Sequence, residues 1–86
     1  MAKYELLIKP SAVKEIEGVS SKADRQRIVK KIKQLSEDPR PQGCEKLSGQ
    51  DRFRVRQGDY RVLYEVDDNE CWVIVTKVGH RKDVYR

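Results

Sequence analysis

The sequence predicts a single α+β domain over residues 1–86. An N-terminal strand and a helical hairpin precede a three-stranded antiparallel meander, and the helices pack on one face of the sheet. Apolar residues recur at helical spacing up to about residue 37, and they alternate with polar residues from about residue 52. The stretch between is rich in proline and glycine, as loops are. A chain of 86 residues has room for one modest core.

The first strand and the first helix are short. Residues 3–9, KYELLIK, have the composition of a strand. Pro10 and Ser11 open a helix, because proline fits the first helical turn, and Gly18 is a plausible stop. The apolar stripe expected on this helix consists of Val13, Ile16 and Val19.

The second helix starts at a motif that resembles a capping box. The Ser21 hydroxyl is placed to accept a free amide, and Asp24 favours the positive end of the helix. Asp38 and Pro39 end the hairpin, which runs from about residue 11 to residue 37, because a residue before proline avoids helical angles. The apolar stripe is Ile28, Ile32 and Leu35. The remaining helix surface carries Arg25, Arg27, Lys30, Lys31 and Lys33.

Three alternating segments predict the meander, with tight turns at Gly58-Asp59 and Asp68-Asn69. Two-residue loops would pair Arg56 with Arg61, and Tyr64 with Val73. The face expected against the helices holds Phe53, Val55, Tyr60, Val62, Tyr64, Val66, Cys71, Val73 and Val75. The opposite face gathers Arg52, Arg54, Arg56 and Arg61 beside Leu63, Trp72 and Ile74.

Four guanidinium groups on one sheet face point to an anionic ligand. Like charges directly opposite each other destabilise a sheet by up to about 1 kcal/mol. An anion held between Arg56 and Arg61 would offset that cost, and arginine offers a planar donor fork to phosphate. The alternative is a solvated face whose arginines pair with Glu65 or with a C-terminal carboxylate.

Charge and cysteine content narrow the class of protein. The chain has 19 Lys and Arg against 14 Asp and Glu, a net charge of +5, which suits nucleic acid or an acidic protein partner. We expect a cytoplasmic protein without a membrane partner, since no run approaches the roughly 18–20 apolar residues of a span and the N-terminus lacks a signal-peptide profile. Cys44 and Cys71 lack metal-site spacing, so we expect neither a metal site nor a disulfide, and Cys71 should be a small buried residue.

Two stretches, RVRQGDYRVLYE from Arg54 and VGHRKDVYR from Val78, resemble the RelE branch of the RelE/ParE toxins, and the similarity covers essentially the whole chain. The resemblance implies a toxin of a prokaryotic type II toxin–antitoxin pair that cleaves messenger RNA in the ribosomal A site. A ribose 2′-hydroxyl would attack its adjacent phosphate, leaving a 2′,3′-cyclic phosphate and a 5′-hydroxyl, with no metal or cofactor. The implied partners are a RelB-like antitoxin, the ribosome with its rRNA, and mRNA.

The resemblance also implies a catalytic set. Arg54 and Arg56 lie where RelE members often carry lysines, and Arg61 would grip the phosphate. Arg81 would act as general acid or stabilise charge. Arginine cannot readily lose a proton, because its pKa lies above about 12, so Arg54 and Arg56 would supply only charge.

His80 then becomes the candidate general base, since an unperturbed imidazole titrates near about 6.5, with a structural role as the alternative. Tyr85 would stack on or orient the substrate, or else pack on the sheet edge. The candidates for RNA-backbone contacts, which otherwise form a solvated surface, are Arg52 on the sheet and Arg25, Arg27, Lys30, Lys31 and Lys33 on the second helix.

Two other functions fit the same fold. A ParE-like toxin would inhibit DNA gyrase by protein contact and would need no nuclease site. A non-catalytic RNA-binding module would use the arginine face without cleaving. The residues that favour the nuclease are Arg56, Arg61, Arg81 and Tyr85, which a gyrase inhibitor has no chemical need to retain.

Overall fold

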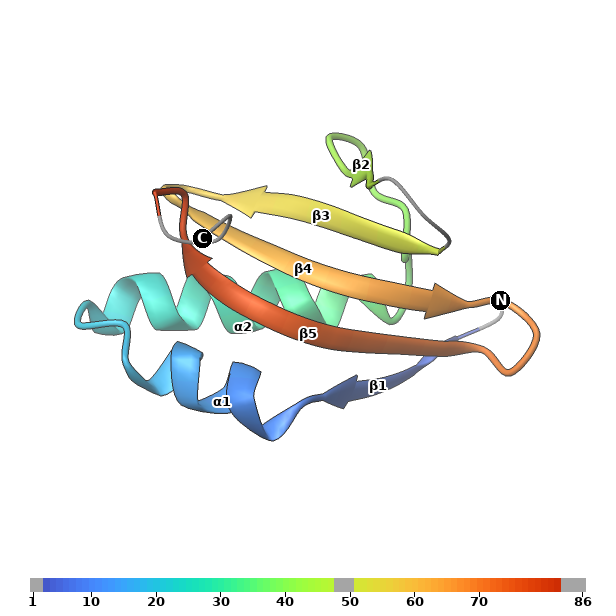
Figure 1. Ribbon diagram of the computed structural model, residues 1–86, viewed down its shortest axis with the longest axis horizontal. Helices are drawn as coiled ribbons and strands as arrows, with labels where there is room; N and C mark the ends of the chain where they lie inside the picture. The colour runs from blue at the N-terminus through green and yellow to red at the C-terminus, as the bar shows by residue number, and fades with distance from the viewer. Residues whose placement is uncertain (1–2, 48–50, 83–86) are drawn as a thin grey trace.

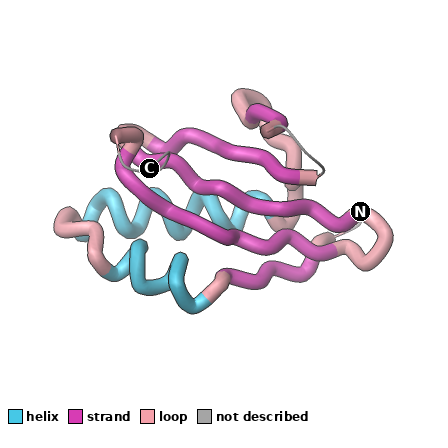
Figure 2. The backbone as a smooth tube through the Cα atoms, viewed as in Figure 1, coloured by secondary structure: helices cyan, strands magenta, loops and turns pink. Residues whose placement is uncertain are grey.

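The computed structural model describes residues 3–47 and 51–82. Within these residues, a five-stranded sheet of order β1-β5-β4-β3-β2 is covered on one face by both helices (Figure 1). Figure 2 shows the strands as one continuous layer with the helices to one side. The elements are β1 (Glu5–Ile8), α1 (Pro10–Glu17), α2 (Lys22–Leu35), β2 (Glu45–Lys46), β3 (Arg52–Gln57), β4 (Tyr60–Asp67) and β5 (Trp72–His80). This arrangement confirms the predicted α+β fold.

The helical hairpin forms where the capping residues predicted it. The Ser21 hydroxyl accepts from the Asp24 amide at 3.2 Å, and the Asp24 carboxylate lies 3.5 Å from the Arg27 guanidinium. Arg25 donates to the Val19 carbonyl and so holds the turn between the helices. Neither described helix is long and apolar enough to cross a membrane.

The apolar stripe of α1 differs from the prediction by one residue. Ala12 and Ile16 are buried, whereas Val13 is 38% exposed. Ile16 follows Ala12 by four residues and Val13 by three, and both spacings bring side chains to one side of a helix. The docking of α1 on β5 selects the pair that contains Ala12, so the expectation for Val13 was wrong.

The core lies between the helices and the inner face of the sheet, as predicted. It consists of Ala12, Ile16, Val19, Ile28, Ile32 and Leu35 from the helical half and Phe53, Val55, Val62, Tyr64, Val66, Val73, Val75 and Val78 from the strands. Tyr60 is half-buried at the margin of this core. The buried Tyr64 hydroxyl donates to the Pro39 carbonyl at 2.8 Å, so its polar atom is satisfied. Burial raises the pKa of this phenol.

The hairpin between β3 and β4 has the predicted register. Arg56 pairs with Arg61, and Val55 pairs with Val62. Gly58 takes a φ of 60° in the two-residue turn, a conformation that glycine adopts without steric cost. Because the inner-face valines meet, the arginines on either side of them face outward together.

The turn between β4 and β5 is longer than predicted. Asp67 pairs with Trp72, which leaves a four-residue connection. The Asp67 carboxylate accepts from the amides of Asn69 at 2.9 Å and Glu70 at 3.0 Å. These bonds stabilise a wider turn than the Asp-Asn pair suggested. Cys71 therefore ends the turn at a φ of 58° and is half-buried, so the expectation of a core position for Cys71 was wrong.

A β-bulge in β5 changes the register further. Thr76 is the extra residue, opposite the junction of Leu63 and Tyr64 on β4, and its hydroxyl donates to the Leu63 carbonyl at 3.2 Å. A bulge moves the alternation of side chains on by one residue. As a result Val78 faces the core with 2% exposure, and Lys77 pairs across from Leu63.

The first helix protects the edge of β5 where β1 ends. β1 runs parallel to β5 from Trp72 to Val75, and the chain then turns into α1. Beyond that point, one Glu15 oxygen accepts from the Val78 amide at 2.9 Å, and the other lies 3.3 Å from the Lys77 ammonium. A side chain thus takes the place of a strand partner, which satisfies an edge amide that would otherwise invite pairing.

A polar network ties the loop after α2 to the turn after β4. Arg40 donates two hydrogen bonds to the Asp68 carboxylate, at 3.1 and 2.7 Å, and its guanidinium lies 5.1 Å from the centre of the Phe53 ring. The Tyr4 hydroxyl donates to the same carboxylate at 2.7 Å. The hydrogen bonds from Arg40 and then from Tyr4 lower the pKa of Asp68.

Replacing Asp68 should give a stability loss that depends on pH. Because the pKa of Asp68 is lowered in the folded state, its contribution is present above the unfolded pKa of about 3.9 and is lost as the pH falls through the folded value. Thermal unfolding should therefore show a slightly lower Tm for Asp68→Asn at neutral pH, and the difference should disappear once the pH falls below the folded-state pKa of Asp68. Glu70→Gln, in the same turn, is the control, and a pH-independent deficit for Asp68→Asn would contradict the prediction.

Candidate functional site

The candidate site lies on the open face, which is the sheet face opposite the helices (Figure 1). Strand pairing arranges its side chains in rows across β3, β4 and β5. The rows are Arg56, Arg61 and Gly79; then Arg54, Leu63 and Lys77; then Arg52, Glu65 and Ile74. The face therefore changes from strongly cationic at the β3–β4 turn to apolar and mixed in charge at the other end.

Four arginines form the arginine cluster: Arg54, Arg56, Arg61 and Arg81. Arg61 is half-buried on β4, and Arg56 is its exposed partner on β3. The pKa of Arg61 is lowered first by burial and then by the positive charges of Arg56, Arg54 and Arg81. That repulsion shows that the guanidiniums share one region, as the sequence predicted for the sheet arginines. Arginine side chains carry a positive charge near neutral pH, so the cluster is strongly cationic.

Arg81 reaches the cluster because the end of β5 is fastened to the neighbouring turn. Its backbone amide donates to the Asp59 carbonyl at 2.8 Å. Asp59 lies in the turn between β3 and β4, next to the Arg56–Arg61 row. One backbone hydrogen bond thus places the exposed Arg81 beside strands that are distant in sequence.

Glu45 is a site residue that the sequence analysis missed. It lies on β2 opposite Arg54, and its carboxylate accepts from Nε at 3.3 Å and from Nη2 at 3.0 Å. The hydrogen bonds and charge of Arg54, and then the charges of Arg56 and Arg61, lower the pKa of Glu45. One carboxylate therefore interacts with the guanidiniums of Arg54, Arg56 and Arg61, and the cluster keeps a net positive charge. A two-residue strand inside a loop rich in proline and glycine leaves no periodicity by which Glu45 could have been found.

His80, the single histidine of the sequence, lies apart from the arginine cluster. It pairs with Tyr60, and the two rings meet edge to face with their centres 5.6 Å apart. Alternation from the buried Val78 places His80 on the helix side of the sheet. Its Nδ1 accepts from the Lys82 amide at 3.2 Å. The expected grouping of His80 with the arginines is therefore not found, because the bulge reverses the alternation at the end of β5.

The other predicted residues are spread over the molecule. Tyr85 lies outside the described residues. On the open face, Arg52 is 3.8 Å from the Glu65 carboxylate. The candidates on α2, namely Arg25, Arg27, Lys30, Lys31 and Lys33, belong to the helix layer and not to the arginine cluster. A single strand of RNA lying along the open face would not touch both sets.

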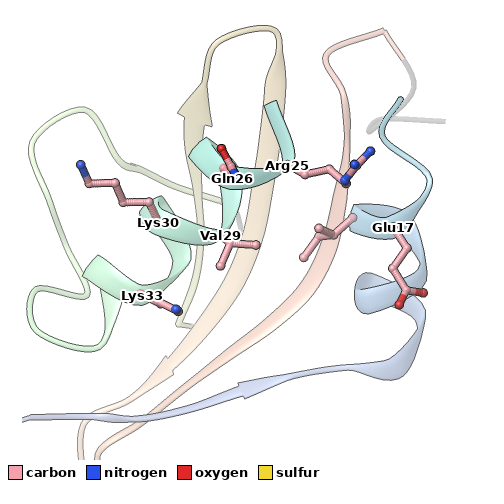
Figure 3. A pocket seen from close by; sticks show the side chains of 7 residues that line it. Glu17, Arg25, Gln26, Val29, Lys30 and Lys33 are labelled. Carbon is pink, nitrogen blue, oxygen red and sulfur yellow. The ribbon is translucent and has the colours of Figure 1, made fainter. Parts of the chain in front are cut away.

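A groove of about 610 Å³ lies between α1 and α2 (Figure 3). Ile16 and Val29 supply its apolar part. Its polar border is formed by Glu17, Arg25, Gln26, Lys30 and Lys33. The chain thus has two surfaces suited to binding, a cationic sheet face and an apolar groove with a mostly cationic border.

Comparison with known proteins agrees with this fold. A family model described as the ParE toxin of the type II toxin–antitoxin system parDE matches residues 6–85. The toxin RelG of Mycobacterium tuberculosis is 47% identical over 34 residues, which are 40% of this chain and 39% of that protein. The aligned segment thus covers about two fifths of the length of this curated relative.

Two solved structures extend the likeness over nearly the full chain. The archaeal RelE–RelB complex of Pyrococcus horikoshii matches with a TM-score of 0.84 and 29% identity, over 98% of this chain and 100% of that one. The isolated RelE toxin of Escherichia coli matches with a TM-score of 0.78 and 28% identity, over 95% and 90% of the two chains. With the family match over most of its length, the chain belongs to the RelE/ParE family of toxins of type II toxin–antitoxin systems.

Proposed function

We propose that this toxin is a ribosome-dependent endoribonuclease that cleaves messenger RNA in the A site and so inhibits translation. The observation that carries the proposal is the arginine cluster. Arg56 lies directly opposite Arg61 on adjacent strands, an arrangement that an anionic ligand between them would stabilise. The scissile phosphate is such an anion, and arginine forks match its oxygens.

The reaction needs removal of the 2′ proton, stabilisation of the charge that develops at phosphorus, and stabilisation of the leaving oxygen. The 2′-oxygen attacks the adjacent phosphorus, and a base removes its proton. The bond from phosphorus to the 5′-oxygen then breaks, and that oxygen takes a proton from water. The guanidiniums of Arg54, Arg56 and Arg61 would stabilise the negative charge that develops on the phosphorane. Arg81, at the end of β5, would stabilise charge on the leaving oxygen. The products are a 2′,3′-cyclic phosphate and a 5′-hydroxyl.

Glu45 is our candidate for the group that removes the 2′ proton. The guanidiniums cannot accept a proton near neutral pH, and His80 lies on the other side of the sheet. The Glu45 carboxylate is bonded to Arg54 and lies within the charge field of Arg56 and Arg61. Its lowered pKa keeps the carboxylate ionised, so its oxygens are available as acceptors, and the same shift makes it a weaker base.

A second candidate function is gyrase inhibition by protein contact, which the sequence analysis considered for a ParE-like toxin, and the matched family model is described as a ParE toxin. The groove between α1 and α2 would serve that function, because it offers apolar contact area. The arginine cluster favours the nuclease over gyrase inhibition, and the match to a toxin family favours it over an RNA-binding module without catalysis. Primer extension on translated messenger separates all three functions.

Arg61→Ala should strongly reduce A-site cleavage while the protein stays folded. Losing a donor that stabilises the transition state lowers the rate by about 100- to 1,000-fold. Primer extension on messenger in a translating extract gives the readout. Lys14→Ala is the matched control, since it removes one exposed cation from α1 without touching the open face. If wild-type protein yields no cuts on the ribosome, the nuclease proposal is rejected.

Glu45→Gln should lower the single-turnover rate by about 100-fold, which is within the usual range for loss of a general base. Binding to the ribosome should be unchanged or tighter, because a counter-charge to Arg54 is removed. Rates are measured with excess toxin on programmed ribosomes, and Glu37→Gln on the exposed loop is the control. A rate equal to or above that of wild type would show that Glu45 is only a counter-ion.

We also propose that a RelB-like antitoxin docks in the groove between the helices. RelE is seen with RelB in the complex from Pyrococcus horikoshii. Around the groove, the cations Arg25, Lys30 and Lys33 outnumber the single carboxylate of Glu17. A segment with apolar and acidic side chains complements that surface.

The same helix-side cations would contact rRNA when the antitoxin is absent, because backbone contacts need only positive charge. Lys30 and Lys33 border the groove, so antitoxin and ribosome would compete for this surface. The site of action would be the cytoplasm, where translating ribosomes are found.

Val29→Glu should weaken antitoxin binding by at least about tenfold, because it puts an unpaired carboxylate against an apolar and acidic partner. Calorimetric titration with the cognate antitoxin measures the affinity. Val13→Glu is the control, since Val13 is an exposed apolar residue on α1 that does not line the groove. Equal affinities of Val29→Glu and Val13→Glu would place the antitoxin elsewhere.

A further inference from the structure

A second cavity lies on the open face beside the arginine cluster. Its volume is about 290 Å³, and the residues that line it include Lys9, Leu47, Arg52, Leu63, Glu65 and Thr76. Leu63 pairs directly with Arg54 of the cluster. The cavity therefore starts where the cationic part of the open face ends.

The register shows how this cavity would lie relative to a phosphate held by the arginine cluster. Arg52 and Arg54 are two residues apart on β3, so they project from the same face about 7 Å apart. A single nucleotide spans that distance between its phosphate and its base. Small-molecule sites usually measure about 300–1,000 Å³, so a cavity just below this range suits one base and not a larger ligand.

The lining combines apolar surface with a few polar groups. Leu47 and Leu63 offer contact for the flat faces of a base. The Thr76 hydroxyl donates to the Leu63 carbonyl, and its oxygen can still accept. The Glu65 carboxylate and Arg52 guanidinium are 3.8 Å apart, a separation longer than a hydrogen bond, so both groups keep hydrogen-bonding capacity for a ligand.

We propose that this cavity binds the base next to the scissile phosphate and selects guanine through Glu65. The inference rests on the proposed nuclease function and adds a specificity residue to it. Guanine presents two adjacent N–H donors, at N1 and N2, which a carboxylate accepts as a pair. Its O6 acceptor suits a donor such as Arg52 or Lys9.

The other bases fit Glu65 less well. Cytosine sets the acceptor N3 beside its amino group, and adenine sets N1 beside its own, so each turns a lone pair toward the carboxylate. Uracil has one donor between two acceptors. A carboxylate that meets an acceptor loses a hydrogen bond and gains repulsion, and sites that bond a polar edge discriminate strongly against analogues that lack it.

The test uses free nucleotides, so it does not depend on cleavage. Guanosine 3′-monophosphate should bind the wild-type protein at least about tenfold more tightly than inosine 3′-monophosphate, which lacks the N2 amino group. Cytidine 3′-monophosphate should bind more weakly still. In Glu65→Gln the advantage of guanosine over inosine should largely disappear. Affinities are measured by titration followed by NMR, which also locates the shifts on Leu63, Glu65 and Thr76.

Glu5→Gln is the matched control, because Glu5 is exposed on the same side of the sheet, opposite Trp72 and outside the cavity. Equal binding of guanosine and cytidine nucleotides to the wild type would overturn the proposal. The proposal would also be overturned if inorganic phosphate displaced the nucleotides completely and their affinities did not depend on the base. In that case the arginines alone would make the contact.

Cleavage on the ribosome separates this inference from the proposed function. Wild-type cuts should be enriched beside guanine, and Glu65→Gln should reduce that enrichment while total cleavage remains. Cleavage whose base preference is unchanged in Glu65→Gln would reject the guanine subsite and leave the nuclease standing. Guanosine-selective binding without any ribosomal cleavage would reject the nuclease and support the cavity as a guanine site.

Discussion

The pairing of β3 with β4 is the constraint on which the rest of the molecule depends. Val55 and Val62 meet on the inner face, and their burial forces Arg56 and Arg61 to meet on the outer face. Fully burying a valine stabilises the fold by about 1.5–3 kcal/mol, whereas two like charges opposite each other cost up to about 1 kcal/mol. Core burial therefore outweighs the repulsion, and the fold holds together a cationic site that electrostatics alone would disperse.

The charge of this site is adjusted by residues from the edges of the sheet. β2 brings Glu45 to Arg54, and the amide of Arg81 bonds to the turn between β3 and β4. One carboxylate reduces the repulsion among four guanidiniums without neutralising them. The positive charge that remains, near an ionised carboxylate, is what transfer of a proton from a ribose hydroxyl at a phosphate would require.

The two binding surfaces lie on opposite sides of the molecule. The open face carries the arginine cluster and the adjoining cavity, and the helix layer carries the groove bordered by Lys30 and Lys33. An antitoxin in the groove would block ribosome contacts without entering the arginine cluster. The bulge at Thr76 contributes to this division, because it turns His80 toward the helices and away from the side of the sheet that carries Arg56 and Arg61.

Side-chain periodicity in the sequence determined the α+β class, the helical hairpin, and the register that sets Arg56 opposite Arg61, because these depend on local spacing and on a tight glycine turn. Tertiary structure decided what periodicity does not encode. The Asp67 carboxylate widened the second turn, the bulge at Thr76 reversed the side on which His80 lies, and a two-residue strand brought Glu45 to Arg54. Each of these outcomes depends on hydrogen bonds and packing between segments distant in sequence, which no local pattern of apolar residues records.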